Sequence, residues 1–341
     1  MTQTVLLTGA SGYIAKHIAL QLLNAGYSVR ASLRNLNRAD EMRSALIPHL
    51  TAPLGDRLSF VALDLDQDAG WAEALTGVDV LIHTASPLPL AQPKNADDLI
   101  RPAVQGALRA LRAARDAGVV RVVMTSSSDA IMGGPLPGGK AAFDENDWTN
   151  PDAPGTTPYS QSKTLAERAA WDFVETQAPQ MQLTVINPGF VIGSPLDAHF
   201  GASVSVIKRL LNARDPMLPT FGFPMVDVRD VALAHVRALS SPASVGQRYI
   251  TAERFMWIGD VAQTLKTAFP GRKIVTRRAP DFVVRILALF DKAVASIVPI
   301  LGKGEGASAA KAKADLGLTF RDARTSVIET AQFLIDHKLV K

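Results

Sequence analysis

The chain has 341 residues, of which 47% are hydrophobic and 20% are charged, and its formal net charge is +4. This composition excludes a disordered chain, and 36 basic residues spread among 32 acidic ones, without a block of like charges, argue against nucleic acid as a partner. The lack of cysteine excludes disulfides, thiolate metal sites and a catalytic thiol.

We expect no secretory signal, because Met1 to Gln3 run directly into an apolar segment without a preceding charged region or a following cleavage site. We therefore expect a cytoplasmic protein. Residues 282–301 form an apolar stretch, but Arg285, Asp291 and Lys292 interrupt it, so it falls short of the roughly 20 apolar residues of a membrane span. We interpret it as a pair of buried packing helices ending near Pro299, and we expect no membrane partner.

The first half of the chain alternates short β-branched runs with longer helical segments. Strands are predicted at 4–8, 28–33, 58–62, 78–83, 119–124 and 183–186. Helices are predicted at 13–24 and 99–117, each closed by a glycine that tolerates the left-handed conformation, Gly26 and Gly118. This rhythm is typical of βαβ units, so the predicted fold class is α/β, a Rossmann-type doubly wound parallel sheet with a smaller C-terminal substrate lobe.

After Pro188 the alternation fades, and further helices are predicted near 203–212, 228–239, 257–268 and 324–337. We therefore expect residues 1–187 to form a dinucleotide-binding domain that also carries the catalytic residues. Residues 188–341 would form mainly the substrate lobe, with about 225–240 returning to the first domain. Two long loops, 87–94 and 133–158, are expected to act as lids or substrate walls.

A glycine-rich segment, Thr8 to Ala15, follows the first predicted strand and opens a helix, which is the context that a dinucleotide-binding fingerprint requires. Gly9 allows a tight turn, Gly12 lets the backbone approach a pyrophosphate, and Ala15 lets the helix pack closely on the strand. The phosphate would lie at the positive end of the helix dipole.

The end of the second strand favours NADPH over NADH. An acidic residue that would accept the ribose hydroxyls of NAD is missing there, and Arg34 follows the strand, with Arg38 a turn later. A guanidinium suits a 2′-phosphate because it is always charged and donates in a planar fork. The alternative is that both arginines are solvated residues beside a helix start. Asp64 and Leu65, past the third strand, could bracket an adenine.

Tyr159 and Lys163 lie four residues apart at the start of a predicted helix, and so on one helix face. An ammonium beside a phenol lowers the pKa of the phenol from about 10 toward the working range of a proton donor. The strand at 119–124 ends in Thr125 and three serines, where a hydroxyl could hydrogen-bond a substrate oxygen. Most of these serines would serve only as a polar strand end.

Together, the following segments resemble the extended short-chain dehydrogenases, in the branch of dihydroflavonol reductases, cinnamoyl-CoA reductases and fungal aldehyde or methylglyoxal reductases: 8–15, 125–127, 159–163, 187–189 and 226–232. The resemblance covers most of the chain to about residue 240. It implies a Ser/Tyr/Lys active site of Ser127, Tyr159 and Lys163, with Ser126 and Ser128 as alternative registers for the serine.

The resemblance also implies NADP(H) as cofactor and places the segment 189–194 near the nicotinamide. The implied cofactor contacts are Gly9, Ser11, Gly12, Tyr13, Ile14, Arg34, Asp64, Leu65, Thr84, Ala85, Ser86, Tyr159, Lys163, Pro188 and Val191. The expected activity is the reversible NADPH-dependent reduction of an aldehyde or ketone to the alcohol, with Tyr159 as general acid, Lys163 tuning it and Ser127 orienting the carbonyl.

The chain departs from the plant cinnamoyl-CoA reductases before Tyr159, where it has Ala153 to Pro158 in place of a motif with Cys and Trp. Aldehydes or ketones are therefore expected rather than thioesters. Aromatic residues in the predicted pocket walls favour a bulky apolar or aromatic substrate: Phe143, Trp148, Phe200, Phe221 and Phe223. The oligomeric state stays open, with a homodimer as one option.

Two alternatives stay open. An NAD-dependent epimerase or hydroxysteroid dehydrogenase of the same fold would use the same three residues, but the missing acid after the second strand disfavours bound NAD. A non-catalytic NADP(H)-sensing module would need only the glycine-rich segment and would be expected to lack Tyr159 or Lys163. No metal site is expected, because the six histidines show no ligand spacing with one another.

Overall fold

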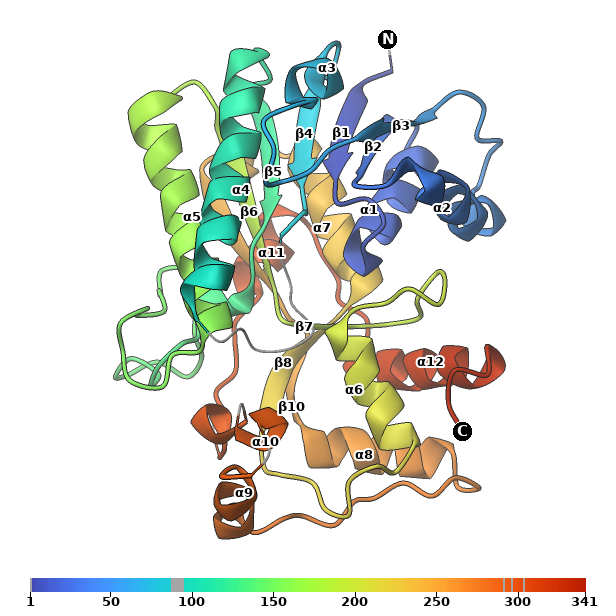
Figure 1. Ribbon diagram of the computed structural model, residues 1–341, viewed down its shortest axis with the longest axis vertical. Helices are drawn as coiled ribbons and strands as arrows, with labels where there is room; N and C mark the ends of the chain where they lie inside the picture. Colours follow the sequence, from blue (N-terminus) through green and yellow to red (C-terminus); the bar gives the residue numbers. More distant parts are fainter. Residues whose placement is uncertain (1, 87–94, 291, 296, 303) are drawn as a thin grey trace.

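The computed structural model describes residues 2–86, 95–290, 292–295, 297–302 and 304–341, so the loop predicted at 87–94 lies outside the described residues. Within the described residues, seven parallel strands form a large sheet in the order β3-β2-β1-β4-β5-β6-β9 (Figure 1). They are β1 (Thr4–Thr8), β2 (Ser28–Leu33), β3 (Leu58–Ala62), β4 (Val80–His83), β5 (Arg121–Thr125), β6 (Gln182–Pro188) and β9 (Gln247–Thr251). The strand order reverses between β1 and β4, which confirms the predicted doubly wound parallel sheet.

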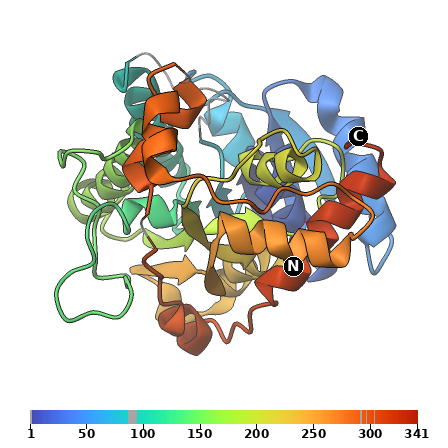
Figure 2. The same ribbon diagram turned by 90° about the horizontal axis from the view of Figure 1, so that it is seen from below.

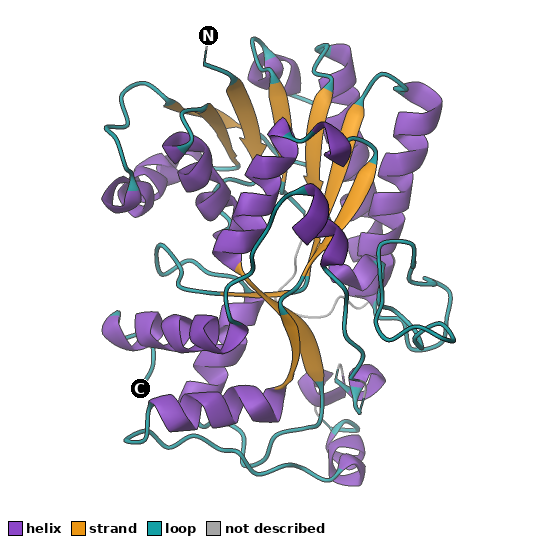
Figure 3. Ribbon diagram, turned by 180° about the vertical axis from the view of Figure 1, so that it is seen from behind, coloured by secondary structure: helices purple, strands orange, loops and turns teal. Residues whose placement is uncertain are grey.

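Helices cover both faces of the large sheet (Figure 3). One face packs against α1 (Tyr13–Asn24), α2 (Ala39–Leu46), α7 (Val228–Ser240) and α11 (Ala310–Asp315). The other packs against α3 (Trp71–Leu75), α4 (Asp97–Asp116) and α5 (Pro158–Gln177). The strands of a sheet buried on both faces are continuously apolar, and β1, with Val5, Leu6 and Leu7 all fully buried, shows this pattern.

A second lobe is built on a small sheet in the order β10-β8-β7, where β7 (Phe190–Ile192) pairs in parallel with β8 (Gly222–Asp227) and β8 pairs antiparallel with β10 (Arg254–Trp257). Its helices are α6 (Ala202–Leu211), α8 (Ile258–Ala268) and α12 (Ala323–Asp336), which share one core with the small sheet (Figure 2). The helices were predicted to within a residue or two, whereas the three short strands and β9 were not.

Parts of the chain after residue 188 return to the large sheet. α7 packs against α1, through a core that includes Ala232, Ala234 and Ala238, and the Gln21 side chain donates a hydrogen bond to the Arg229 carbonyl at 2.7 Å. β9 then adds a strand beside β6, and α11 packs against it. The return thus extends past residue 240, and a boundary at residue 187 between two folding units stays a prediction.

The apolar stretch after residue 280 forms the short helices α9 (Asp281–Leu287) and α10 (Lys292–Ala295). Interpreting it as buried packing helices was wrong for α9 and the residues that follow, because Phe282 is 66% exposed, Leu289 78% and Phe290 85%. Seven residues make too short a helix to bury more than one face, and Val284 takes the buried position. Among the described residues, no helix is long and apolar enough to cross a membrane.

The described residues also form five short 3-10 turns: η1 (Leu36–Arg38), η2 (Ile47–His49), η3 (Ser128–Ala130), η4 (Pro242–Ser244) and η5 (Val298–Ile300). η4 is tied to the large sheet by the buried Arg121 of β5. Its guanidinium donates hydrogen bonds to the Thr184 hydroxyl at 2.9 Å, the Ser244 hydroxyl at 2.8 Å and the Gln182 carbonyl at 2.6 Å. One side chain therefore satisfies acceptors from β6 and the turn that leads into β9.

We predict that Arg121→Met, which keeps an apolar stem of similar length, lowers the free energy of unfolding by about 2–4 kcal/mol, because several buried acceptors lose their donor. Denaturant unfolding of both proteins measures this difference. Arg112→Met on the exposed face of α4 is the matched control and should leave the free energy unchanged. Equal unfolding midpoints for wild type and Arg121→Met would contradict the prediction.

Candidate active site

The glycine-rich turn between β1 and α1 lies at the carboxyl edge of the large sheet. Gly9 has φ +66°, and a Cβ there would lie 2.9 Å from the Cα of Ala85, so both its conformation and its surroundings require glycine. Gly12 is the N-cap of α1, and its N–H donates to the Gly9 carbonyl at 2.9 Å. Ala15 is buried in the core between α1 and the sheet, as predicted for a small residue at this position.

The ends of β1 and β4 are joined by the Thr8 hydroxyl. It accepts hydrogen bonds from the Thr84 and Ala85 N–H groups, both at 3.2 Å, and lies 2.9 Å from the Nδ1 of His83. The segment Thr84 to Ser86 therefore runs directly beside Gly9. Burial, reinforced by the charge of Lys163, lowers the pKa of His83 to about 4, so its ring is neutral at physiological pH.

Of the two arginines after β2, only Arg34 is presented to solvent without a partner among the described residues. Arg38 forms a bidentate ion pair with Glu41, with Nε and Nη2 at 3.0 and 2.7 Å from its carboxylate oxygens. Arg34 is therefore the better placed of the two to meet a phosphate.

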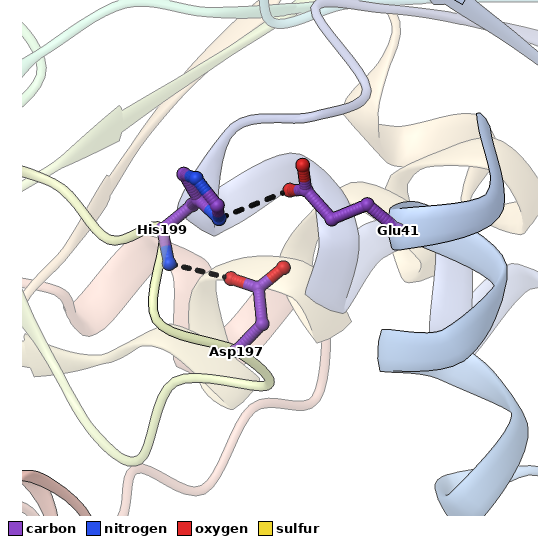
Figure 4. Close-up of side chains that lie close together, drawn as sticks. All are labelled: Glu41, Asp197 and His199. Carbon is purple, nitrogen blue, oxygen red and sulfur yellow. Dashed lines mark hydrogen bonds and ion pairs between the residues drawn. The ribbon is translucent and has the colours of Figure 1, made fainter. Parts of the chain in front are cut away.

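Glu41 also belongs to a charged cluster that reaches the second lobe. Figure 4 shows His199 facing Glu41, with Nδ1 3.1 Å from the carboxylate, while the His199 N–H donates to Asp197 at 2.8 Å. The ammonium of the buried Lys16 forms an ion pair with Asp197 and lies 3.8 Å from Glu41. Ligand atoms of Glu41, Asp197 and His199 come within 4.8 Å of one another. Because Lys16 and Arg38 already compensate the two carboxylates, we interpret this cluster as an ion-pair network.

Asp64 and Leu65 follow β3 at the same sheet edge. The Asp64 carboxylate accepts a hydrogen bond from the Asp66 N–H at 3.1 Å, and the Leu65 side chain lies against Gly106 of α4. Both are partly exposed, and their role at an adenine stays a prediction.

α5 begins where the candidate catalytic residues lie. Thr157 is its N-cap, with the hydroxyl accepting from the Ser160 N–H at 3.1 Å, and Pro158 occupies the first helical position. This start places Tyr159 and Lys163 on successive turns of one face, with Lys163 Nζ 5.8 Å from the Tyr159 ring centre.

Ser127 is the serine that faces this pair. Its hydroxyl lies close enough to the Tyr159 phenol to lower the pKa of that phenol, whereas the Ser126 hydroxyl donates to the buried Glu167 at 2.6 Å, away from it. Ser128 is buried as the first residue of η3. The geometry thus favours Ser127, the register that the family resemblance implied.

The proton affinities of the pair differ from our expectation. Burial raises the pKa of Tyr159 above its usual value, the Asp129 carboxylate raises it further, and the bond with Ser127 lowers it. Burial lowers the pKa of Lys163 to about 8, against the carboxylates of Asp129 and Glu167. The expected lowering of the Tyr159 pKa by Lys163 was therefore wrong for this structure, because burial of the phenol outweighs it. The Tyr159 phenol is therefore held in its neutral form.

Behind these residues lies a buried ion pair that the sequence did not reveal. Glu167, one turn after Lys163, is fully buried and pairs with Arg248 of β9 at 2.6 Å. Its other oxygen accepts from Ser126 and, at 2.7 Å, from the Asn187 amide, which also donates to the Ser127 carbonyl at 3.1 Å. The pair thus connects α5, β5, β6 and β9 directly behind the active site.

Asp129 was also not predicted. Its carboxylate lies next to Ser127 and Ser160, and its charge acts on both Tyr159 and Lys163. The signal in the sequence was a carboxylate two residues after a strand-end serine, a spacing that hydroxyl-capped turns share and that does not by itself indicate a site.

The crossover from the large sheet to the small one lies beside the site. A Cβ at Gly189 would lie 2.2 Å from the Pro224 carbonyl oxygen, so the chain passes closely over β8 between Pro188 and Val191. The Tyr13 hydroxyl donates to the Gly193 carbonyl at 2.7 Å, so the side chain of Tyr13 points to this segment. Contact of the cofactor with Tyr13 would then involve its backbone, and contacts of Ser11, Ile14, Pro188 and Val191 stay predictions.

The aromatic residues expected to wall the substrate pocket are differently placed. Phe143 and Phe221 are buried at 3% and 8% exposure, and the Arg248 guanidinium covers the ring of Trp148 at 3.6 Å. Phe223 is partly exposed and stacks on Phe190, with ring centres 4.6 Å apart. This stack follows Gly189 directly and is the better candidate for an apolar wall.

Comparisons with known proteins agree with this geometry. The model of the NAD dependent epimerase/dehydratase family matches residues 5–251. The chain is 34% identical over 277 residues to cinnamoyl-CoA reductase 1 of Arabidopsis thaliana, covering 81% of this chain and 77% of that protein. It is 32% identical to the ketoreductase azaE of Aspergillus niger, covering 98% of each. The crystal structure of yeast methylglyoxal/isovaleraldehyde reductase Gre2 complexed with NADPH is similar with a TM-score of 0.79 and 27% identity, over 99% of this chain and 100% of that one.

We predict that Glu167→Gln lowers the free energy of unfolding by about 3 kcal/mol, because Arg248 is left buried without its counter-charge. Chemical denaturation measures the change. Glu175→Gln, on the exposed side of the same helix, is the control and should unfold like wild type. Wild-type stability of Glu167→Gln would show that the pair contributes nothing to the fold.

Proposed function

This chain belongs to the NAD dependent epimerase/dehydratase family, among the extended short-chain dehydrogenases, and from this premise we propose that it reduces an aldehyde or ketone to the alcohol with NADPH. The observation that carries the proposal is the convergence of Ser127, Tyr159 and Lys163 at the sheet edge that also holds the glycine-rich turn. Its curated relatives are named reductases, and an oxidoreductase activity follows for this chain.

The residues at the turn fit a dinucleotide. Gly9 packs tightly on Ala85, and no side chain caps the N-terminus of α1 at Gly12, so the N–H groups of the first turn of α1 can meet a pyrophosphate. Thr84 to Ser86 would border the same ligand. NADP(H) is the cofactor, as in the structural relative crystallised with NADPH and in a relative of Candida albicans named as a putative NADPH-dependent methylglyoxal reductase.

Arg34 would hold the 2′-phosphate. It is exposed at the end of β2, while Arg38 is already engaged by Glu41. With no carboxylate at the strand end to accept ribose hydroxyls, this edge disfavours NAD, and with it the NAD-dependent epimerase or hydroxysteroid dehydrogenase alternative. The presence of both Tyr159 and Lys163 disfavours a module that only binds the cofactor.

NADPH, when bound, supplies the hydride for the carbonyl carbon. Tyr159 is the general acid and transfers its phenolic proton to the carbonyl oxygen, which its raised pKa makes possible up to alkaline pH. Ser127 orients that oxygen by a hydrogen bond. Lys163 favours the phenolate that remains, and with a pKa of about 8 it is largely charged at neutral pH.

The substrate class is a carbonyl compound rather than a thioester. The relatives named for methylglyoxal, isovaleraldehyde and ketone reduction act on aldehydes or ketones by their names. The partly exposed stack of Phe190 and Phe223 supports an apolar or aromatic group next to the carbonyl.

We predict that Tyr159→Phe lowers kcat by about 100-fold or more while NADPH binding stays intact, because only the transferable proton is lost. Steady-state oxidation of NADPH with a panel of aromatic aldehydes and ketones measures turnover, and fluorescence titration measures binding. Tyr27→Phe, remote from the site, is the matched control. Full activity of Tyr159→Phe would refute the assignment.

A second prediction concerns the choice of cofactor. Arg34→Ala should raise the Kd for NADPH by about 10- to 100-fold, since one charge-assisted contact is lost, and leave the Kd for NADH nearly unchanged. Titration with both cofactors measures the two constants. Arg324→Ala, an exposed arginine of α12, should change neither. An equal loss of affinity for both cofactors would place Arg34 elsewhere than at the 2′-phosphate.

A further inference from the structure

Asp129 forms a hydrogen-bonded unit with two hydroxyls at the active site. Its Oδ2 accepts from the Ser127 hydroxyl at 3.1 Å, and its Oδ1 accepts from the Ser160 hydroxyl at 2.9 Å. Its own N–H donates back to the Ser127 oxygen at 3.1 Å, so Ser127 caps η3. One carboxylate therefore bridges the strand end that carries Ser127 and the first turn of the helix that carries Tyr159.

The hydrogen-bond directions in this unit are determined. Ser160 gives its only hydroxyl proton to Asp129, so the Thr157 hydroxyl, 2.9 Å from the Ser160 oxygen, must donate to Ser160. Ser127 likewise donates to Asp129, and its oxygen accepts from the Asp129 N–H. Both hydroxyl protons of the unit therefore point to the Asp129 carboxylate.

The backbone of Asp129 is anchored independently. Its carbonyl accepts from the Thr149 hydroxyl at 2.6 Å, and that hydroxyl also accepts from the Gly133 N–H at 2.7 Å. A Cβ at Gly133 would lie 2.2 Å from the Thr149 side chain, so the loop packs tightly here. The carboxylate is consequently held in place rather than free to turn away.

Of the charged groups around Tyr159 and Lys163, Asp129 is the one without an ion-pair partner among the described residues. Within the ranges that the structure describes, three titratable groups act on Tyr159 and Lys163: His83 of β4 is neutral, Glu167 of α5 is paired with Arg248, and Asp129 of η3 is the third. In the part of the chain that the structure describes, no Lys or Arg forms an ion pair with Asp129. Among the described residues, its negative charge therefore acts on Tyr159 and Lys163 without an ion-pair partner of its own.

We propose that Asp129 is a positioning residue. Its carboxylate holds Ser127 and the first turn of α5 together through hydrogen bonds, and its charge keeps Tyr159 and Lys163 protonated. This inference rests on the proposed reductase function and extends it. A carbonyl oxygen that binds must draw the Ser127 proton away from Asp129, so the carboxylate also competes with substrate for that hydroxyl. Carbonyl reduction needs a protonated Tyr159, and the charge of Asp129 favours that protonated form.

The test is the pH profile of Asp129→Asn, which keeps size and hydrogen bonding but removes the charge. Loss of a nearby negative charge makes ionised Tyr159 and neutral Lys163 less costly, so the alkaline decline of kcat/KM for carbonyl reduction should move to lower pH by about one unit. The rise of alcohol oxidation, which needs the phenolate, should move in the same direction. Asp129→Glu, which keeps the charge, should retain the wild-type pH profile with a lower kcat.

Asp152→Asn is the matched control, since Asp152 is an exposed carboxylate in the loop before Tyr159 and should leave both profiles unchanged. A wild-type pH profile for a folded, NADPH-binding Asp129→Asn overturns the proposal. If Asp129→Asn does not fold, Ser160→Ala decides: loss of one anchor of the carboxylate should lower kcat by about two- to tenfold without moving the pH profile, and an unchanged kcat overturns the proposal.

Failure of the reductase function is detected separately. If wild type turns over no carbonyl compound, the absorbance of tyrosinate is titrated instead, as the difference between each protein and its Tyr159→Phe counterpart. Tyr159 should ionise at higher pH in wild type than in Asp129→Asn, whatever the reaction. Equal ionisation in both proteins overturns the role of Asp129 alone.

Discussion

The parallel pairing of β1, β4, β5 and β6 brings the carboxyl ends of four strands to one edge of the large sheet. The glycine-rich turn, the segment after His83, the serines after Thr125 and the chain after Pro188 lie together because of that pairing alone. Each is a short polar segment after a buried strand, and none of them is near the others in sequence. The strand pairing does not place α5. The cap at Thr157 fixes where this helix begins, and from that start Tyr159 and Lys163 face the strand ends.

Behind the site, charge is handled in two ways. Glu167 and Arg248 are buried and fully compensated, and they fix the backs of β5, β6 and β9. Asp129 is partly exposed and compensated only by hydroxyls and an N–H group. The first arrangement gives rigidity, because removal of either partner strands a charge in the interior. The second arrangement leaves the negative charge of Asp129 free to act on Tyr159 and Lys163.

The sequence predicted the first half of the fold well, because strands buried on both faces and a glycine-rich turn have strong local signals. β1, β2, β3 and α1 have the predicted bounds. The later strands have no such signal: β8 contains Gly222 and Pro224, and β9 contains Arg248, which is buried only because Glu167 compensates it. Ser127, Tyr159 and Lys163 were identified from spacing and resemblance. Asp129 and the raised pKa of Tyr159 were not, since both depend on burial and on neighbours that only the fold brings together.

The ion pair of Lys16 with Asp197 differs from most charge contacts of this protein, since the Lys16 side chain is only 2% exposed. Mobile ions screen exposed pairs such as Arg43 and Asp40 over distances of about 10 Å at 0.1 M salt, but they reach a buried ammonium poorly. The ion pair of Lys16 and Asp197 connects the segment after β7 to α1, and we expect it to persist in dilute buffer and in concentrated salt alike. Rising ionic strength would weaken the exposed ion pairs of the surface before it weakened this contact between the two lobes.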